Sequence, residues 1–243
     1  MQDCWWAEAC RSARRPAGTS TLLLSPNIWT YIEFSATIGA AGAFTVRVGG
    51  SAIWLTASGV NTQNSANATV NQVYLDDSNG GAPNIYDDLY ILNSLGAENN
   101  APLGEMRVYT TEPSGNGSSS SWTPSAGSNF GNVNQASPDD DTTYNFSDTP
   151  GQIDLYTSPA IAPTGTVAGV QVNLCERKDD VGARTTAAEY KALSGTSYTG
   201  ANNFTLGTGY SIDRQVYDID PDTGAAWTLP GLNGAQFGIN CIA

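Results

Sequence analysis

Two stretches of this chain place an apolar side chain at every second position. Residues 43–50 read AFTVRVGG, so the large apolar residues share one face of an extended strand and the polar residues share the other. Residues 166–175 read TVAGVQVNLC and alternate in the same way. Because an amphipathic helix has a period of 3.6 residues, this period of two predicts half-buried β-strands. The Gly49-Gly50 pair then predicts a hairpin turn.

The composition favours many short strands joined by turns. The 243 residues include 26 glycines and 12 prolines. Charged residues make up 14% of the chain, against about 25% in an average soluble domain. Hydrophobic residues make up 40%, which is enough to build a folded core. We therefore predict an all-β fold.

The residue types that are missing exclude several classes of function. Without histidine, the chain has no Ser-His-Asp triad, no Cys-His nucleophile pair and no His-ligated zinc or haem. The net charge of −13, with Lys178 and Lys191 as the only lysines, argues against nucleic acid as a partner. No apolar stretch approaches the roughly 18 residues of a membrane helix, so we expect no membrane partner. We expect a binding or assembly protein and not an enzyme.

Residues 1–18 differ in composition from the rest, and we treat them as an N-terminal arm. They hold Trp5 and Trp6 together with three of the ten basic residues. One interpretation is an arm that docks on a partner, with both tryptophans as anchors. The other is a frayed terminus, or a start codon placed upstream of the folded part. We expect Cys4 and Cys10 to be reduced, because two thiolates alone make a poor zinc site.

Residues 19–111 form the first predicted β-region. Turn-forming residues separate its alternating segments, which is the sequence signature of a sandwich. The expected strands are WTYIEFSATIG at 29–39, AFTVRVGG at 43–50, SAIWLTASG at 51–59, VNQVYLDD at 70–77, NIYDDLYILN at 84–93 and GEMRVYTT at 104–111.

The order of these strands resembles the second half of a concanavalin A-like, laminin-G-like jelly roll, over roughly Thr21–Asn93. The sharpest element is YDDLY at residues 86–90, since a strand of this type closes the sandwich in that family. A complete jelly roll needs about twice as many strands. The resemblance therefore implies either an incomplete sandwich that a neighbouring chain finishes or a misplaced start. Because an incomplete sheet exposes edges and an apolar face, we expect a partner or another protomer to cover it.

The second half of the chain is expected to be a polar linker followed by a second sandwich. Residues 112–138 are polar and of low complexity around Trp122, which predicts a linker or long loop. Residues 139–243 form the predicted C-terminal β-sandwich module. Its expected strands lie at 142–146, at 152–157, at 166–180, at 183–200 with a bend at Ser194-Gly195, at 210–220 and at the end of the chain.

This half resembles a recurrent C-terminal module of tailed-bacteriophage virion proteins, in which a concanavalin A-like domain precedes the module. The segments that carry the resemblance are GEMRVYTTEP, SWTPSAGSNFGNVNQASPDDDTTYNFSDTPGQIDLY, VAGVQVNLCERKDDVGAR and IDPDTGAAWTLPGLNGAQFGI. The resemblance implies a structural component of a phage particle, such as a capsid decoration, a head fibre or a tail-associated protein. It also implies other virion proteins and copies of the chain itself as partners, assembly in the host cytoplasm, and a final location in the virion.

Three aspartates at alternate positions are candidate metal ligands. Asp218, Asp220 and Asp222 resemble the start of a calcium loop, and alternate aspartates in a turn supply three of the six to eight oxygens that Ca²⁺ takes. The alternative is an aspartate-rich turn after a strand, bent by Pro221 and Gly224. Calcium is the candidate cofactor, and we expect no other.

Trp122 lies in a polar segment and is the candidate for an exposed ligand or partner contact. Packing between domains is the alternative for this side chain. An exposed aromatic residue, together with calcium, would suit the second function that we consider. That function is a lectin-like, carbohydrate-binding adhesin that contacts glycans of the host surface.

Cys175 and Cys241 lie on two expected strands of the C-terminal module. If those strands are neighbours, the two residues form a candidate cross-strand disulfide. The alternative is a pair of small buried hydrophobic side chains.

Overall fold

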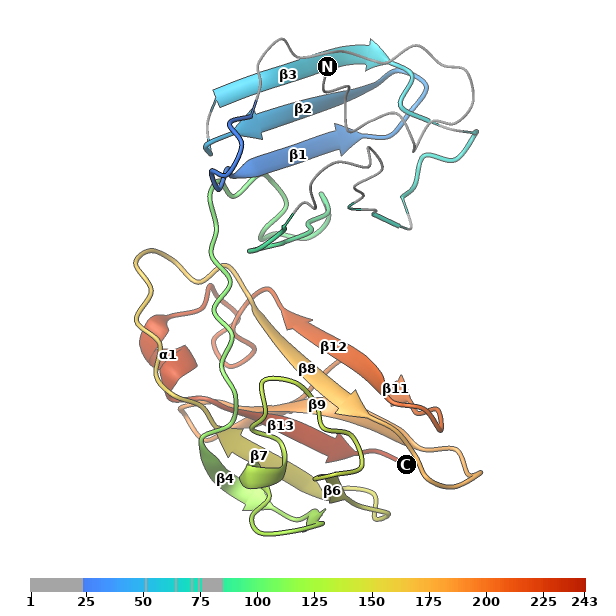
Figure 1. Cartoon of the computed structure of the whole chain (residues 1–243), viewed down its shortest axis with the longest axis vertical. Coiled ribbons are helices and arrows are strands. Elements are labelled where there is room, and N and C mark those ends of the chain that lie inside the picture. The colour runs from blue at the N-terminus through green and yellow to red at the C-terminus, as the bar shows by residue number, and fades with distance from the viewer. Residues whose placement is uncertain (1–23, 51, 64, 71, 74, 76–84) are drawn as a thin grey trace. The chain divides into compact units, whose positions relative to one another are not determined.

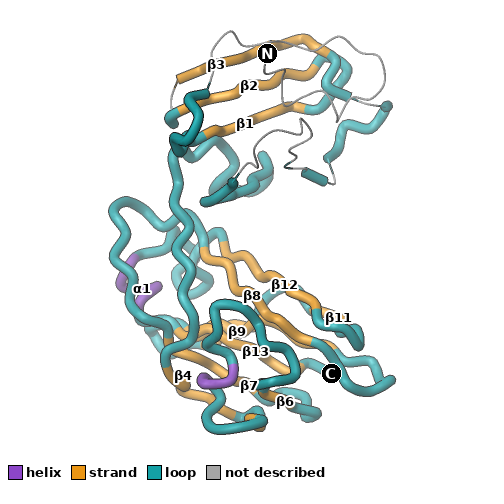
Figure 2. Tube along the Cα trace, in the orientation of Figure 1, coloured by secondary structure: helices purple, strands orange, loops and turns teal. Residues whose placement is uncertain are grey.

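The structure is a computed structural model of the chain, and it describes residues 24–243 except 51, 64, 71, 74 and 76–84. The regular structure of these residues is β-strand, apart from the short helix α1 (Leu229–Asn233) and the 3-10 turn η1 (Phe130–Asn132) (Figures 1 and 2). The predicted all-β fold class is confirmed. The chain divides into an N-terminal unit, residues 1–108, and a C-terminal unit, residues 109–243.

An antiparallel sheet organises the N-terminal unit. Its strands, in this order, are β1 (Ile32–Thr37), β2 (Gly42–Val48) and β3 (Ala52–Val60). Glu33 of β1 lies directly opposite Arg47 of β2. Gly49 and Gly50, which follow β2, have φ angles of 62° and 79°, a conformation that favours glycine. The strands and the hairpin turn predicted from the two-residue period are therefore confirmed here.

The later strands predicted in this unit are not found among its described residues. The described residues of 70–77, 84–93 and 104–111 lie outside any strand. In the YDDLY segment, Asp88 has a φ of 53°, in the left-handed region that an extended strand does not contain. Its carboxylate accepts a hydrogen bond from the backbone N of Val108 at 2.7 Å and pairs with Arg107 at 2.8 Å. The prediction of a closing strand is therefore wrong, because Asp88 stabilises a turn.

The N-terminal unit buries few of its large apolar side chains. Among those that the structure describes, Phe44 is the buried one, with 6% of its surface exposed. Trp29, Ile85 and Leu95 are 69%, 75% and 74% exposed. Other exposed apolar side chains of this unit are Ile28, Ile32, Ile53, Val70, Val73, Leu89, Ile91 and Val108. The described sheet therefore lacks the closed core of a sandwich.

The C-terminal unit is built on a six-stranded antiparallel sheet. Its strands lie in the order β10-β9-β13-β7-β4, with β11 also paired to β9, and the pair β8–β12 packs over it as a second layer (Figure 1). A further small pair joins β5 and β6. The bounds are β4 (Gly115–Ser120), β5 (Thr123–Pro124), β6 (Asn145–Phe146), β7 (Ile153–Thr157), β8 (Val170–Glu176), β9 (Thr185–Lys191), β10 (Ser197–Thr199), β11 (Phe204–Thr205), β12 (Ser211–Tyr217) and β13 (Gln236–Cys241).

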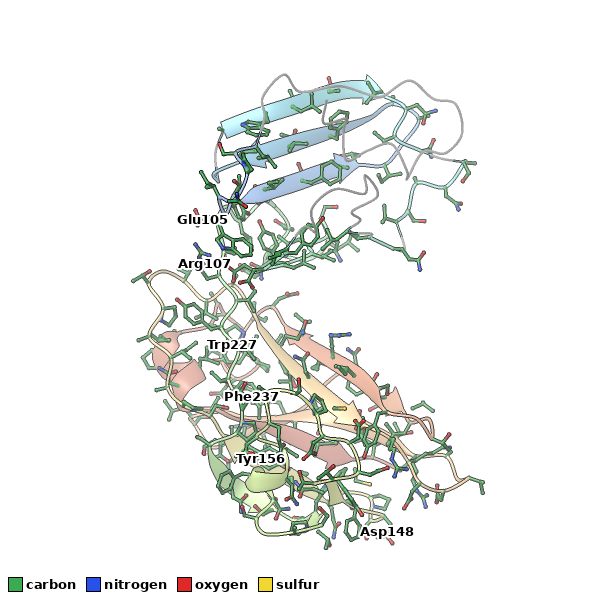
Figure 3. All side chains as sticks on the ribbon, in the orientation of Figure 1. Glu105, Arg107, Asp148, Tyr156, Trp227 and Phe237 are labelled. Atoms are coloured by element: carbon green, nitrogen blue, oxygen red, sulfur yellow. The ribbon has the colours of Figure 1, made fainter. Side chains whose placement is uncertain are left out.

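Aromatic rings fill the space between the two layers. Tyr190 of β9 is 1% exposed, and the rings of Tyr198 and Phe237 stack against it with centroid distances of 5.7 and 5.4 Å. Trp227 meets the Tyr190 ring edge-on at 5.4 Å, and its Nε1 donates a hydrogen bond to the backbone O of Tyr217 at 3.0 Å. Figure 3 labels Trp227 and Phe237 in this layer. The C-terminal unit thus has a closed aromatic core.

A strand lies in the segment that was predicted to be a linker. β4 falls within residues 112–138 and pairs with β7, so this segment belongs to the C-terminal sheet. The sequence of β4 is GNGSSS, without an apolar side chain that would have predicted it. A Cβ on Gly117 would lie 2.6 Å from Oε1 of Gln236, so glycine permits the close approach of this backbone. The linker prediction is corrected for this part of the chain.

The other strands predicted in the C-terminal unit are confirmed. β6, β7, β8, β12 and β13 lie within the expected segments, and β9 and β10 are the two arms of the predicted bent pair. The bend occurs at Ser194-Gly195, where Gly195 has a φ of 95°. No helix in the described part of the chain is long and apolar enough to cross a membrane.

Candidate functional site

Exposed apolar side chains of the N-terminal unit form the first candidate site. They come from β1, from β3 and from the segments 28–29 and 85–95, with Val70, Val73 and Val108 in addition. Fully burying one large apolar side chain contributes about 1.5–3 kcal/mol, so leaving many of them in water is costly. Monomeric proteins rarely tolerate such exposure over a large contiguous area, and binding surfaces often show it. We call this set the exposed apolar set of the N-terminal unit.

A hydrogen-bonded cluster holds loop segments against the sheet of this unit. Glu33 is 6% exposed, and its Oε1 accepts hydrogen bonds from the hydroxyl of Tyr90 at 2.5 Å and from the backbone N of Gly104 at 3.3 Å. The hydroxyl of Tyr31 donates to the backbone O of Gly104 and lies beside the hydroxyl of Tyr90. Burial first, and then the hydrogen bond to Glu33, raise the pKa of Tyr90 far above its usual range. Tyr90 therefore remains a hydrogen-bond donor at physiological pH.

Two charged atoms of this unit are buried without a hydrogen-bond partner among the described residues. They are Oε2 of Glu33 and Nη1 of Arg47, on side chains that face each other across β1 and β2. A buried polar atom without a partner costs about 1–3 kcal/mol, and more when it is charged. The sheet thus has unmet polar groups as well as exposed apolar ones.

The structure does not bring the three candidate calcium ligands together. Asp220 is 5% exposed and accepts hydrogen bonds from the hydroxyl of Tyr190 at 2.7 Å and from the backbone N of Asp222 at 2.9 Å. Asp222 accepts from the hydroxyl of Tyr198 at 2.9 Å, and Asp218 is exposed. Among the described residues, no group of three Asp, Glu or Cys side chains is placed to hold a metal ion. Two of these aspartates tie the turn after β12 to the aromatic core.

Trp122 packs within the C-terminal unit and does not stand free in a loop. It is partly buried, its Nε1 donates to the backbone O of Gln152 at 3.0 Å, and its backbone N donates to Oδ1 of Asp154 at 2.8 Å. The other two candidate anchors, Trp5 and Trp6, lie outside the described residues.

Cys175 and Cys241 are free thiols, so the candidate disulfide is wrong. Cys175 is exposed on β8, where it lies opposite Ile212 of β12. Cys241 is buried on β13, where it lies opposite Thr186 of β9. The two strands belong to different layers of the unit, and the two side chains sit in different environments. The alternative of a small buried side chain holds for Cys241 alone.

A buried carboxylate that sequence reasoning missed organises the segment after β4. Asp154 of β7 is fully buried and accepts hydrogen bonds from Nδ2 of Asn129 at 2.7 Å, from the hydroxyl of Tyr156 at 3.0 Å and from the backbone N of Trp122. Asn145 donates in turn to the hydroxyl of Tyr156 at 2.9 Å. The single sequence signal was an acidic residue inside the short apolar run IDLYT. Its partners are distant in sequence, so the network could not be read from the pattern.

Comparisons of this chain with protein-family models, with curated proteins and with solved structures find no match. Its function is therefore inferred from its own sequence and structure.

Proposed function

We propose that this protein is a structural component of a tailed-bacteriophage particle and that it works by assembling with copies of itself and with other particle proteins. It would serve as a capsid decoration, a head fibre or a tail-associated protein. The observation that carries the proposal is the exposed apolar set of the N-terminal unit. The resemblance of the sequence to phage virion modules supplies the kind of particle.

The energetics of the N-terminal unit support assembly. The described part of this unit buries Phe44 and leaves Trp29, Ile85 and Leu95 more than two-thirds exposed. At about 1.5–3 kcal/mol for each buried side chain, covering these three alone would contribute roughly 5–9 kcal/mol before the entropy cost of association. This unit is the part whose stability we expect to depend on a partner.

The chemistry of the rest of the chain is compatible with a particle protein. The C-terminal unit has a closed aromatic core, so that core needs no partner to cover it. The net charge of −13 favours solubility before assembly. The free thiols of Cys175 and Cys241 suit a protein that assembles in a reducing cytoplasm.

The test compares matched charge insertions in the two units by light scattering of the purified chain. Ile85→Glu combined with Leu95→Glu places charges in the exposed apolar set, and Val181→Glu places one at a fully exposed position of the C-terminal unit. We expect the unaltered chain and Val181→Glu to form the same oligomer, and the double variant to shift toward the 25.4 kDa monomer. A soluble monomer for the unaltered chain at all concentrations, without binding of an apolar dye, would contradict the proposal.

A further inference from the structure

β12 is an edge strand of the C-terminal unit (Figure 1). Within the described part of the chain it pairs with β8 alone, over seven residues and without a register shift. No backbone group of residues 211–219 bonds to a described backbone group outside β8. The carbonyls of Val216 and Tyr217 accept hydrogen bonds from the side chains of Gln215 and Trp227. The rest of this edge is open to a further strand, because an edge strand presents unpaired N–H and C=O groups.

A groove of about 410 Å³ lies beside the C-terminal half of this strand. The five consecutive residues 215–219 line one side of it, and Tyr198, Thr199 and Ala201 line the other. Successive residues of a strand point to opposite faces of the sheet. A groove that touches all five residues therefore lies along the edge of the strand and not over one face. Space for an incoming strand is present at the open edge.

β12 lacks the devices that protect the two edges of the larger sheet. A register shift interrupts β4, and β10 has three residues. Both devices make an edge a poor template for another chain. β12 has seven residues, SIDRQVY, with no proline, glycine or lysine. A regular edge of this kind can accept a strand from another molecule by strand addition.

The exposed side chains along this edge carry opposite charges. They are Ile212, Arg214, Val216 and Asp218, at alternate positions. Arg214 and Asp218 lie four residues apart on one face, a distance of about 13 Å in a strand, so they do not pair with each other. Neither forms an ion pair with a described residue. Both charges are therefore available to another molecule.

Two copies of this edge complement each other in one register. Two antiparallel strands related by a two-fold axis place one residue opposite itself. With Val216 at the axis, Arg214 of each copy lies opposite Asp218 of the other, and the two Val216 side chains meet. With Arg214 or Asp218 at the axis, like charges lie opposite each other, which destabilises the pair. The placement of the two charges about Val216 thus favours a second copy of this chain.

We propose that β12 pairs antiparallel with β12 of a second copy, centred on Val216, and joins the two β8–β12 pairs into one four-stranded sheet. The inward-facing Asp213 lies outside the paired segment 214–218. Five paired residues bury far less than the roughly 1,200–2,000 Å² of a standard interface, so the contact is weak in dilute solution. It forms where copies are held close together, as assembly through the N-terminal unit would hold them. The inference goes beyond that assembly, since it assigns a second contact between copies to the other unit.

The first test is disulfide cross-linking of the full chain in which Cys4, Cys10 and the exposed Cys175 are replaced by serine. Val216→Cys places two thiols at the axis, where paired strands hold opposite Cα atoms about 4.5–5.5 Å apart, within the reach of a disulfide. We expect mild oxidation to link this variant into a dimer.

Ile212→Cys is the matched control, because Ile212 lies on the same strand and is 49% exposed against 50% for Val216. In the proposed register the two copies of residue 212 lie about 26 Å apart, so this variant should link about tenfold more slowly. Adding Ile85→Glu and Leu95→Glu removes the contribution of the N-terminal unit. Both rates should then fall, since fewer copies are held together, but the preference for Val216→Cys should remain.

The second test reverses the charges and measures the dissociation constant of the dimer by sedimentation equilibrium, with Ile85→Glu and Leu95→Glu present throughout. Arg214→Asp places a carboxylate opposite Asp218 of the other copy and should raise the dissociation constant about tenfold. Adding Asp218→Arg restores opposite charges with their positions exchanged, and should bring the constant back to within about threefold. Asp179→Arg, at an exposed position outside β12, is the control for a change of net charge.

Two results would overturn the proposal. One is equal cross-linking of Val216→Cys and Ile212→Cys. The other is a double reversal that binds no better than Arg214→Asp alone. Both results are independent of the light-scattering test of the N-terminal unit. Preferential cross-linking through Val216→Cys, with Ile85→Glu and Leu95→Glu present, would support pairing of β12 even where assembly through the N-terminal unit fails.

Discussion

Glu176 of β8 is expected to make the C-terminal unit less stable as pH rises. The side chain is 7% exposed, its Oε2 accepts one hydrogen bond from Oγ1 of Thr186 at 2.8 Å, and its Oε1 is buried without a described hydrogen-bond partner. Burial is the main cause that raises its pKa from 4.5 to about 7, and the charge of Asp213 adds to it, while the Thr186 bond acts against it. No salt bridge to Glu176 lies among the described residues.

The sign and size of this pH dependence of stability follow from the linkage between proton binding and folding. Because the folded pKa of Glu176 lies above the unfolded value, the folded state holds the proton more tightly. The stability from this group is fully present below pH 4.5 and is lost as pH rises through about 7. A gap between 4.5 and about 7 corresponds to about 3 kcal/mol of unfolding free energy.

The variant Glu176→Gln tests this reasoning. At pH 5 it should match the unaltered chain, because glutamine resembles a protonated glutamate in size. At pH 8 it should be more stable by about 2 kcal/mol, since some of the gain is offset by an amide group that needs its own partner. Urea titrations followed through amide NMR signals of β8, β9 and β12 measure the unfolding free energy of this unit alone.

The control is Glu98→Gln, at an exposed position of the N-terminal unit, which should keep the pH dependence of the unaltered chain. The reasoning is refuted if Glu176→Gln and the unaltered chain lose stability equally between pH 5 and pH 8. It is also refuted if the variant is less stable at pH 8.

Three further changes have expected outcomes. Asp154→Ala removes the acceptor of three hydrogen bonds and should lower the unfolding free energy of the C-terminal unit by about 3 kcal/mol. The control Asp148→Ala, at an exposed position, should change this free energy by less than about 0.5 kcal/mol. Urea unfolding measures both variants. Tyr90→Phe removes the hydroxyl that binds Glu33, so amides of β1 should exchange hydrogen faster while those of β9 stay unchanged. A thiol reagent should label Cys175 in the folded protein and the buried Cys241 after unfolding; equal labelling of both in the native state would contradict the assigned burial.

The two-residue period predicted most of the strands because it reports which face of a strand is buried. It succeeded for β2 and β8, whose apolar side chains alternate with polar ones. It failed for β4, because GNGSSS packs through its backbone and carries no apolar pattern. It also failed at YDDLY, where the left-handed φ of Asp88 outweighed the strand-forming residues around it.

The site was harder to predict than the fold, because its contacts join residues far apart in the sequence. The alternation of apolar and polar residues in β8 did indicate that the proposed disulfide would not form. Val170, Val172 and Leu174 share one parity and turn inward, which leaves Cys175 on the outer face. The burial of the unpartnered atoms of Glu33 and Arg47 opposite each other depends on the register of β1 and β2.

The unequal cores of the two units have a consequence for synthesis in the cell. The N-terminal unit leaves the ribosome first, and at about 5–20 residues per second the remainder of the chain needs on the order of ten seconds more. During that interval Trp29, Ile85 and Leu95 belong to a nascent segment with little core of its own. Chaperones that recognise apolar segments would be the first proteins to meet it. Under the proposed assembly function, the yield of assembled protein would then depend on how quickly a neighbouring subunit replaces the chaperone on the nascent N-terminal unit.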